Sequence, residues 1–329
     1  MPLDQPAQAQ RPRIATLSQG IRMLEQKCSA TAHTPNAPEP QAHKTGTPKK
    51  SDQLFLPGLE DFMRAMPNHI ARSSLFAPIA RGRKIQHKNT VLVSRRDAVI
   101  TYSGEQLDEA QADVWLHAMH EAIKHGPLGE SVTLNRAAFL RAIGRDTGSW
   151  QYKWLHRAML ELSFGMLTIG ATKAGVSKLH IGRTRALHLI EGFDYDDELE
   201  TYTYRIDPRW GELYSNREFA LIHWGKRLEI SQGQDMAKAI QRLVATSADT
   251  EQRYGLDWLK AKLQYTSPMR KFRTALSAAL EELERLEIVA DSRLERSTKG
   301  KAQASWRKVV HKQQKMGNCT DLPTHLHST

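Results

Sequence analysis

The chain has only two cysteines among its 329 residues, Cys28 and Cys319, and each lies in a polar terminal region. This placement offers no disulfide framework and no C-x-x-C metal pair, so a reducing compartment is the default. Long hydrophobic runs are also missing. No apolar stretch approaches the ~18 residues of a membrane span, and the N-terminus lacks the apolar region of a secretory signal peptide. We therefore expect a cytoplasmic protein that makes no use of a membrane.

Motifs for catalysis and cofactors are missing as well. Residues 165–173 have the glycine spacing of a P-loop, but Ala171 stands where the phosphate-binding lysine must be. The acidic run at residues 194–200 lacks the glycine and the terminal glutamate of an EF-hand loop, and a polar hairpin turn explains it better. His325 and His327 have the form of a metal-binding pair, but they stand at the end of the chain rather than on a central strand. We expect no enzyme, no cofactor and no metal site.

Positive charge is in excess. Lys and Arg number 47 against 36 Asp and Glu, which gives a formal charge of +11 and a pI near 9.6. Such a balance argues for a polyanionic partner, though not for a fold. The helix that starts at Met269 carries Arg270, Lys271 and Arg273 in its first turns and ends among glutamates. The helix macrodipole disfavours this order by roughly 0.3–1 kcal/mol per charge, so we expect DNA phosphates to stabilise it from outside.

The two ends of the chain differ in composition from the middle. Residues 1–52 hold seven of the fourteen prolines and hardly any aromatic residue, so they cannot bury enough apolar surface to fold. We expect a disordered N-terminal arm there and a flexible tail at residues 313–329. Residues 53–89 combine a short apolar peptide with a basic stretch, and we interpret them as an adaptor that links the arm to the body.

The body has one order of elements twice, in residues 90–207 and 208–312. In the first unit, hydrophobic spacing predicts strands and helices at residues 90–93, 99–102, 114–123, 135–143, 149–164, 167–169, 178–181, 185–190 and 201–206. In the second unit it predicts helices at residues 236–248 and 256–263, the helix from Met269, and a hairpin at residues 288–291 and 306–310. Helix, short helix, turn, helix and hairpin follow one another in both. This order predicts an α+β fold with two tandem winged-helix domains behind the disordered arm.

Candidate DNA-binding residues lie on the helix after each turn and on the hairpins. The first unit offers Arg145, Trp150, Lys153 and Arg157, and the second offers Ser267, Met269, Arg270, Lys271, Arg273 and Thr274. The wing tips add Arg183, Arg185, Lys299 and Lys301, which suit contacts to phosphates or to the minor groove. Two alternatives stay open at this point. Solvated turns carry the same charges, and Trp150 can be a core aromatic.

A short peptide connects the chain to DNA replication. Residues 53–57 (QLFLP) resemble the Q-L-x-L-[FP] peptides that bacterial replication proteins insert into the sliding clamp; Gln53 would supply hydrogen bonds, and Leu54, Leu56 and Pro57 would fill a pocket. Residues 63–68 (MRAMPN) and 71–76 (ARSSLF) are similar to the segment that follows this peptide in the TrfA family of plasmid replication initiators. The resemblance continues through residues 100–104, 127–130 and 269–273 and covers roughly residues 53–310.

The resemblance implies a function. It implies an initiator that binds direct repeats, called iterons, in the double-stranded DNA of a plasmid origin and helps to open an adjacent A+T-rich region. It also implies the sliding clamp, the replicative helicase and DnaA as partners, and it leaves open a monomer-dimer equilibrium. Pro57 departs from the family pattern, because the commoner clamp peptide ends in an aromatic residue. The alternative is a winged-helix transcriptional repressor or copy-control regulator, which has no use for a clamp peptide.

Overall fold

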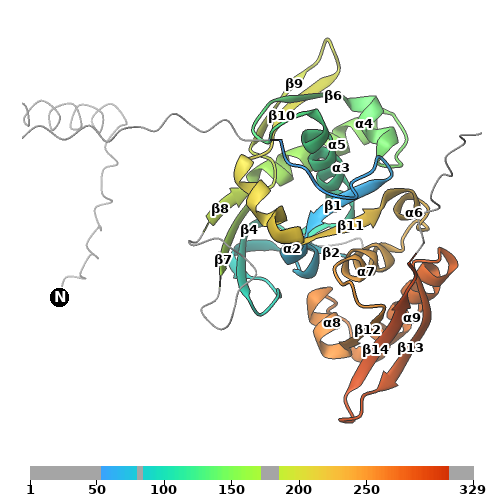
Figure 1. Ribbon diagram of the computed structural model, residues 1–329. Coiled ribbons are helices and arrows are strands. Elements are labelled where there is room, and N and C mark those ends of the chain that lie inside the picture. The colour runs from blue at the N-terminus through green and yellow to red at the C-terminus, as the bar shows by residue number, and fades with distance from the viewer. Residues whose placement is uncertain (1–52, 80–83, 172–184, 311–329) are drawn as a thin grey trace, which may run out of the picture. The chain divides into compact units, whose positions relative to one another are not determined.

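The computed structural model describes residues 53–79, 84–171 and 185–310. Helices and strands are interleaved along these residues (Figure 1), so the predicted α+β class is confirmed. Within the described ranges, no helix combines the length and the apolar character that a membrane crossing requires. The predicted arm and tail, the strand at residues 178–181 and the candidate Arg183 lie outside the described residues.

The first core is built on the long helix α3 (Glu109–His125). A capping box starts this helix: the Asp108 carboxylate accepts hydrogen bonds from the backbone N–H groups of Ala110 and Gln111, and the Gln111 side chain accepts one from Asp108. Trp115 is fully buried, and its indole N–H donates to the Leu189 carbonyl at 3.0 Å.

The other elements of this part are β1 (Met63–Pro67), α2 (Asn68–Arg72), β2 (Phe76–Ala77), β3 (Gln86–Val91), β4 (Ala98–Glu105), β5 (Leu107–Asp108), β6 (Val132–Asn135), α4 (Arg136–Ala142), α5 (Ser149–Phe164), β7 (Met166–Ala171), β8 (Arg185–His188), β9 (Gly192–Asp196), β10 (Thr201–Arg205), η1 (Pro208–Arg217), β11 (Phe219–His223) and α6 (Trp224–Leu228).

Antiparallel sheets cover this core. One has the strand order β3-β4-β7-β8 and another has the order β6-β10-β9, while the short strands β2 and β5 pair in parallel. The acidic run of the sequence forms the turn between β9 and β10, where the Asp196 carboxylate accepts hydrogen bonds from the backbone N–H groups of Glu198 and Leu199. The interpretation of that run as a hairpin turn is therefore confirmed.

The strand pair β1–β11 joins segments that are far apart in the sequence. Met63 lies opposite His223, and Pro67 lies opposite Phe219. Met66 and Ile70 are fully buried in the first core. Residues 63–77 are thus structural elements of the body, which differs from the adaptor that we expected. The physical reason is that β1 is a five-residue segment (MRAMP) whose partner strand is distant, so no local period marks it.

A second core contains α7 (Asp235–Ala245), β12 (Glu251–Gly255), α8 (Leu256–Lys262), α9 (Met269–Arg285), β13 (Val289–Arg296) and β14 (Ala302–Lys308), coloured orange to red in Figure 1. Its sheet has the order β12-β14-β13. The buried residues of the two cores separate between Trp224 and Ile230, later in the chain than the domain boundary predicted at 207/208. The order of short helix, turn, helix and hairpin is present in each half. Its assignment to the winged-helix class stays a prediction.

Candidate nucleic-acid interface

The helix α9 separates an apolar face from a cationic start. Phe272, Leu276 and Leu283 have no exposed surface and lie in the second core. Arg270, Lys271 and Arg273, in the first two turns, are exposed, and no acidic residue occupies the first turn. Throughout the described part of the chain, no carboxylate forms an ion pair with these three cations. Their charges are therefore available to an external anion.

The acidic end of α9 is held within the protein. Arg285 binds Glu282 through two hydrogen bonds of 2.8 Å, and the backbone N–H of Ser231 donates to the same carboxylate at 2.7 Å. The bond from Arg285 is the main reason that the pKa of Glu282 is lowered to about 2. Glu284 accepts a hydrogen bond from the backbone N–H of Ser292. The helix thus keeps unpaired cations at its start and engaged carboxylates near its end.

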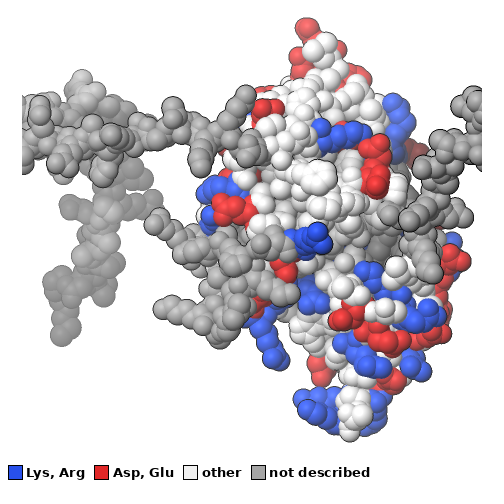
Figure 2. Space-filling view, viewed as in Figure 1, with Lys and Arg blue, Asp and Glu red and all other residues white. Residues whose placement is uncertain are grey.

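The hairpin that follows α9 ends in a basic tip. Ser297 donates its backbone N–H to the Lys301 carbonyl at 2.8 Å, and its hydroxyl accepts from the Lys301 N–H at 3.1 Å. Gly300 has φ of +73°, a left-handed conformation that favours glycine. Lys299 and Lys301 are exposed at this tip, where Figure 2 shows basic side chains gathered beyond the body. The structure places both predicted wing residues where a phosphate can approach them.

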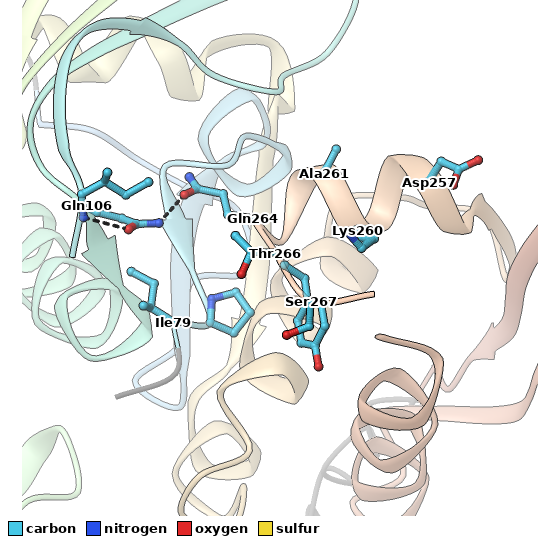
Figure 3. A pocket seen from close by; sticks show the side chains of 11 residues that line it. Ile79, Gln106, Asp257, Lys260, Ala261, Gln264, Thr266 and Ser267 are labelled. Atoms are coloured by element: carbon cyan, nitrogen blue, oxygen red, sulfur yellow. Dashed lines mark hydrogen bonds between the residues drawn. The ribbon is translucent and has the colours of Figure 1, made fainter. Parts of the chain in front are cut away.

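A cleft of about 740 Å³ borders the turn that leads into α9 (Figure 3), and Ser267 lines it together with Lys260 of α8. Across the cleft, Gln106 donates a hydrogen bond to Gln264, and Gln264 donates to the Ser74 carbonyl at 2.6 Å. The turn is therefore attached to the first core. Of the remaining residues predicted here, Met269 and Ser267 are half-buried, and Thr274 is exposed with its hydroxyl on the Arg270 carbonyl.

The corresponding helix of the first half, α5, exposes Trp150 and Lys153 near its start. Trp150 is 68% exposed, so it is not a core aromatic, whereas Leu155 and Leu162 are fully buried. Lys153 has no carboxylate partner within the described ranges. The start of α5 therefore offers an aromatic side chain and one unpaired cation.

Three other cations predicted for the first half have partners within the protein. The Arg145 guanidinium stacks on Trp154 at 3.5 Å from the ring centroid, and burial lowers the pKa of Arg145. Arg157 donates to Glu161 at 2.8 Å and to Glu105 at 3.2 Å. Arg185 lies in strand β8 and pairs with Glu212 at 2.5 Å. The spacing of Arg157 and Glu161 is that of an i,i+4 helical pair, a signal that was visible in the sequence.

The predicted clamp peptide lies against the first core. Gln53 donates its side-chain N–H to the Ile123 carbonyl at 3.3 Å, Leu54 packs on the core, and Leu56 is only 5% exposed. Phe55 is 84% exposed, and Pro57 is exposed as well. Two of the apolar side chains predicted to fill a clamp pocket are thus in contact with the protein itself.

An α+β protein in which each half carries a helix, a turn, a second helix and a hairpin is the class that the fold defines. A family model described as "TrfA protein" matches residues 49–293, more than half of the chain. The chain belongs to the TrfA family, and the resemblance found in the sequence is confirmed.

Two curated relatives and one solved structure are similar to this chain. The chain is 25% identical over 175 residues to "Plasmid replication initiator protein TrfA" of Escherichia coli, a match that covers 52% of this chain and 44% of the relative. It is 25% identical over 186 residues to "Replication protein RepA" of Salmonella typhi, a match that covers 56% of this chain and 51% of the relative. The chain thus matches about half the length of these relatives. The crystal structure of domains 2 and 3 of RctB superposes with a TM-score of 0.50 at 11% identity, covering 74% of this chain and 98% of that one, which shows a likeness of fold.

Proposed function

We propose that this protein is a plasmid replication initiator that binds repeated sites, or iterons, in the double-stranded DNA of its origin and catalyses no reaction. The observation that carries the proposal is the start of α9, where Arg270, Lys271 and Arg273 are exposed and unpaired against the direction of the helix dipole. Family membership supports the same function.

In the proposed complex each half of the protein acts as a winged helix. The start of α9 enters the major groove, so that its cations reach phosphates and base edges while its acidic end points away. Lys299 and Lys301 of the β13–β14 wing contact neighbouring phosphates or the minor groove. The start of α5, with Trp150 and Lys153, makes the contact of the first half.

Nuclease footprinting of the plasmid that encodes the chain tests this proposal. An initiator protects several sites of the same sequence at regular spacing. A single protected palindrome over a promoter would instead indicate a transcriptional repressor or copy-control regulator. Incubation of supercoiled origin DNA with the protein and Mg²⁺ tests the absence of catalysis, because a nicking enzyme would relax the DNA.

We further propose that residues 53–57 bind the sliding clamp. The replicative helicase and DnaA are further proposed partners, and the protein is proposed to help in origin opening. Because Leu54 and Leu56 pack on the first core, the peptide has to leave the body before it can enter a clamp pocket. In a direct titration, changing Gln53 and Leu54 to Ala should weaken clamp binding at least about thirtyfold and leave DNA affinity unchanged. No measurable clamp binding by the wild-type chain or by the Pro57→Phe variant would remove the clamp from the proposal.

A further inference from the structure

Five charged side chains form a cluster between the two cores. Glu109 and Asp113 come from α3, Arg227 from α6, and Lys238 and Arg242 from α7. The side chains of Glu109, Arg227 and Arg242 have no exposed surface, and that of Asp113 is 5% exposed. We call these five residues the ionic cluster.

The pairs within the ionic cluster are direct. Arg227 Nη2 lies 2.9 Å from Glu109 Oε2, and Arg227 Nε lies 2.5 Å from Asp113 Oδ1. Arg242 forms a second ion pair with Glu109, and Lys238 Nζ lies 2.7 Å from Asp113 Oδ2. Arg227 also donates to the Lys238 carbonyl at 3.1 Å. The carboxylates of Glu109 and Asp113 are thus each bound by two cations.

The ionic cluster lies between the helices that support the two proposed DNA contacts. In the first core, α5 packs against α3, and in the second core, α9 packs against α7. One chain of packed elements from one DNA contact to the other therefore runs α5, α3, ionic cluster, α7, α9. The buried apolar residues of the two cores form separate groups, and the charged side chains of α3 and α7 meet between them.

Buried ion pairs contribute little net stability, because the cost of removing the charges from water offsets their attraction. They are directional, however. The planar guanidinium of Arg227 makes hydrogen bonds to two carboxylates of α3 at once, which ties α6 to α3 at two points. Apolar burial carries no such directional constraint. Such a cluster suits a junction whose geometry matters more than its strength.

We propose that the ionic cluster fixes the separation between α5 and α9, so that one molecule binds the two parts of a repeat at a single spacing. The proposal rests on the proposed function, since it takes both helices as DNA contacts. Glu109, Asp113, Arg227 and Arg242 are on this view positioning residues, which touch no DNA themselves.

The test compares two DNA duplexes. One carries the plasmid's own repeat as defined by footprinting, and the other carries the same repeat with two base pairs inserted between the segments protected by the two halves. The insertion turns one segment by about 70° around the duplex axis, given about 10–10.5 base pairs per turn. The full-length wild-type chain should bind the inserted duplex at least about thirtyfold more weakly than the native one.

The variant that tests the proposal replaces the buried charges by apolar side chains of similar size, as Glu109→Leu, Arg227→Met and Arg242→Met together. It should bind the native and the inserted duplex within about threefold of each other. Asp113→Leu with Lys238→Met removes the Asp113–Lys238 pair and the contact of Arg227 with Asp113, but leaves Glu109 bound by both arginines. This double variant should give an intermediate ratio even if the triple variant does not fold. Arg209→Met removes the ion pair between the exposed Arg209 and Asp207, and this control should keep the wild-type ratio.

Each outcome is informative. A ratio that stays at the wild-type value in a folded triple variant, and in the double variant, overturns the proposal but leaves the proposed function intact. The proposal is also overturned, and the proposed function kept, if the wild-type chain protects repeats but binds the inserted duplex as tightly as the native one. A wild-type chain that protects no repeats overturns the proposed function, and this proposal with it. Loss of spacing selectivity in the triple variant, with one cooperative melting transition, supports the proposal.

Discussion

Replacing Arg270, Lys271 and Arg273 together by Ala should abolish specific binding to the repeats without harming the fold. The three side chains are exposed and have no ion-pair partner in the described chain, so their removal breaks no internal ion pair. The opposite face of α9, from Phe272 to Leu283, stays in the second core. Stability should even rise slightly, by about 1–2 kcal/mol at low salt, because three cations leave the positive end of the helix dipole.

The size of the DNA effect follows from the kind of contact. A lost phosphate contact lowers the slope of log K against log salt by about 0.9, so three lost contacts lower it by about 3. A lost base contact costs about 1–3 kcal/mol. Even at about 1 kcal/mol for each side chain, the triple variant should bind its repeat about 150-fold more weakly at physiological salt.

The assay is a fluorescence titration of a labelled repeat at several salt concentrations, with thermal melting of each variant. The matched control is Arg253→Ala with Arg293→Ala and Arg307→Ala. It removes the same net charge from the sheet β12-β14-β13, but each of these arginines is paired with a carboxylate. The control should retain specific binding. If it loses as much affinity as the α9 variant, net charge alone explains the effect, and the assignment of α9 as the DNA-reading helix is refuted.

Three further predictions concern the body and the peptide. Glu109→Gln should lower the free energy of unfolding by about 3–5 kcal/mol, because two buried arginines lose their charged partner. The melting temperature should fall by on the order of 10 °C. An unchanged melting temperature would contradict the buried pairs. Burial lowers the pKa of Lys262 to about 7, so between pH 7 and about 10.5 the unfolded chain binds more protons, and the free energy of unfolding should rise with pH by up to about 1.4 kcal/mol per unit. Lys262→Met should remove this rise in pH-dependent denaturant unfolding and stabilise the protein at pH 6, and an unaltered pH profile would count against it. A free peptide of residues 51–60 should bind the clamp about 10- to 150-fold more tightly than the whole chain, because Leu56 has to be exposed in the latter; equal affinities would show that the peptide is already free.

The elements that the sequence predicted well are those with a local period. The helix expected at residues 149–164 has those bounds in α5, and the helix expected from Met269 starts there in α9. Their apolar residues recur on one side of a helix, a property of the segment alone. The unpaired cations at the start of α9 could also be anticipated, since charge order along one helix needs no knowledge of its neighbours.

The features that escaped prediction depend on distant partners. Strand β1 is recognisable only together with β11, and β12 (EQRYG) carries one buried and one half-buried side chain among charged residues. Glu109, Arg227 and Arg242 are charged residues that would ordinarily be assigned to the surface, and only the packing of α3, α6 and α7 shows that they are buried together. Likewise, Arg185 looked like a wing-tip cation until Glu212, on a different element, was found beside it.

The internal pairing of charge makes the two halves unequal partners for DNA. A phosphate that approaches Arg157 or Arg185 has to compete with Glu105, Glu161 or Glu212, and the attraction is correspondingly weak. Among the described residues that were predicted to bind DNA, Lys153 is the one unpaired cation on α5. Helix α9 and its wing carry five such cations: Arg270, Lys271, Arg273, Lys299 and Lys301. Lys153→Ala should therefore lower the salt slope of repeat binding by about 1, whereas Arg157→Ala with Arg185→Ala should leave it nearly unchanged. If the two arginine substitutions lower the slope by about 2, the carboxylates do not compete with phosphates. The first half would then bind DNA mainly through its charges, and not through the contacts of Trp150 or through the position in which α3 holds α5.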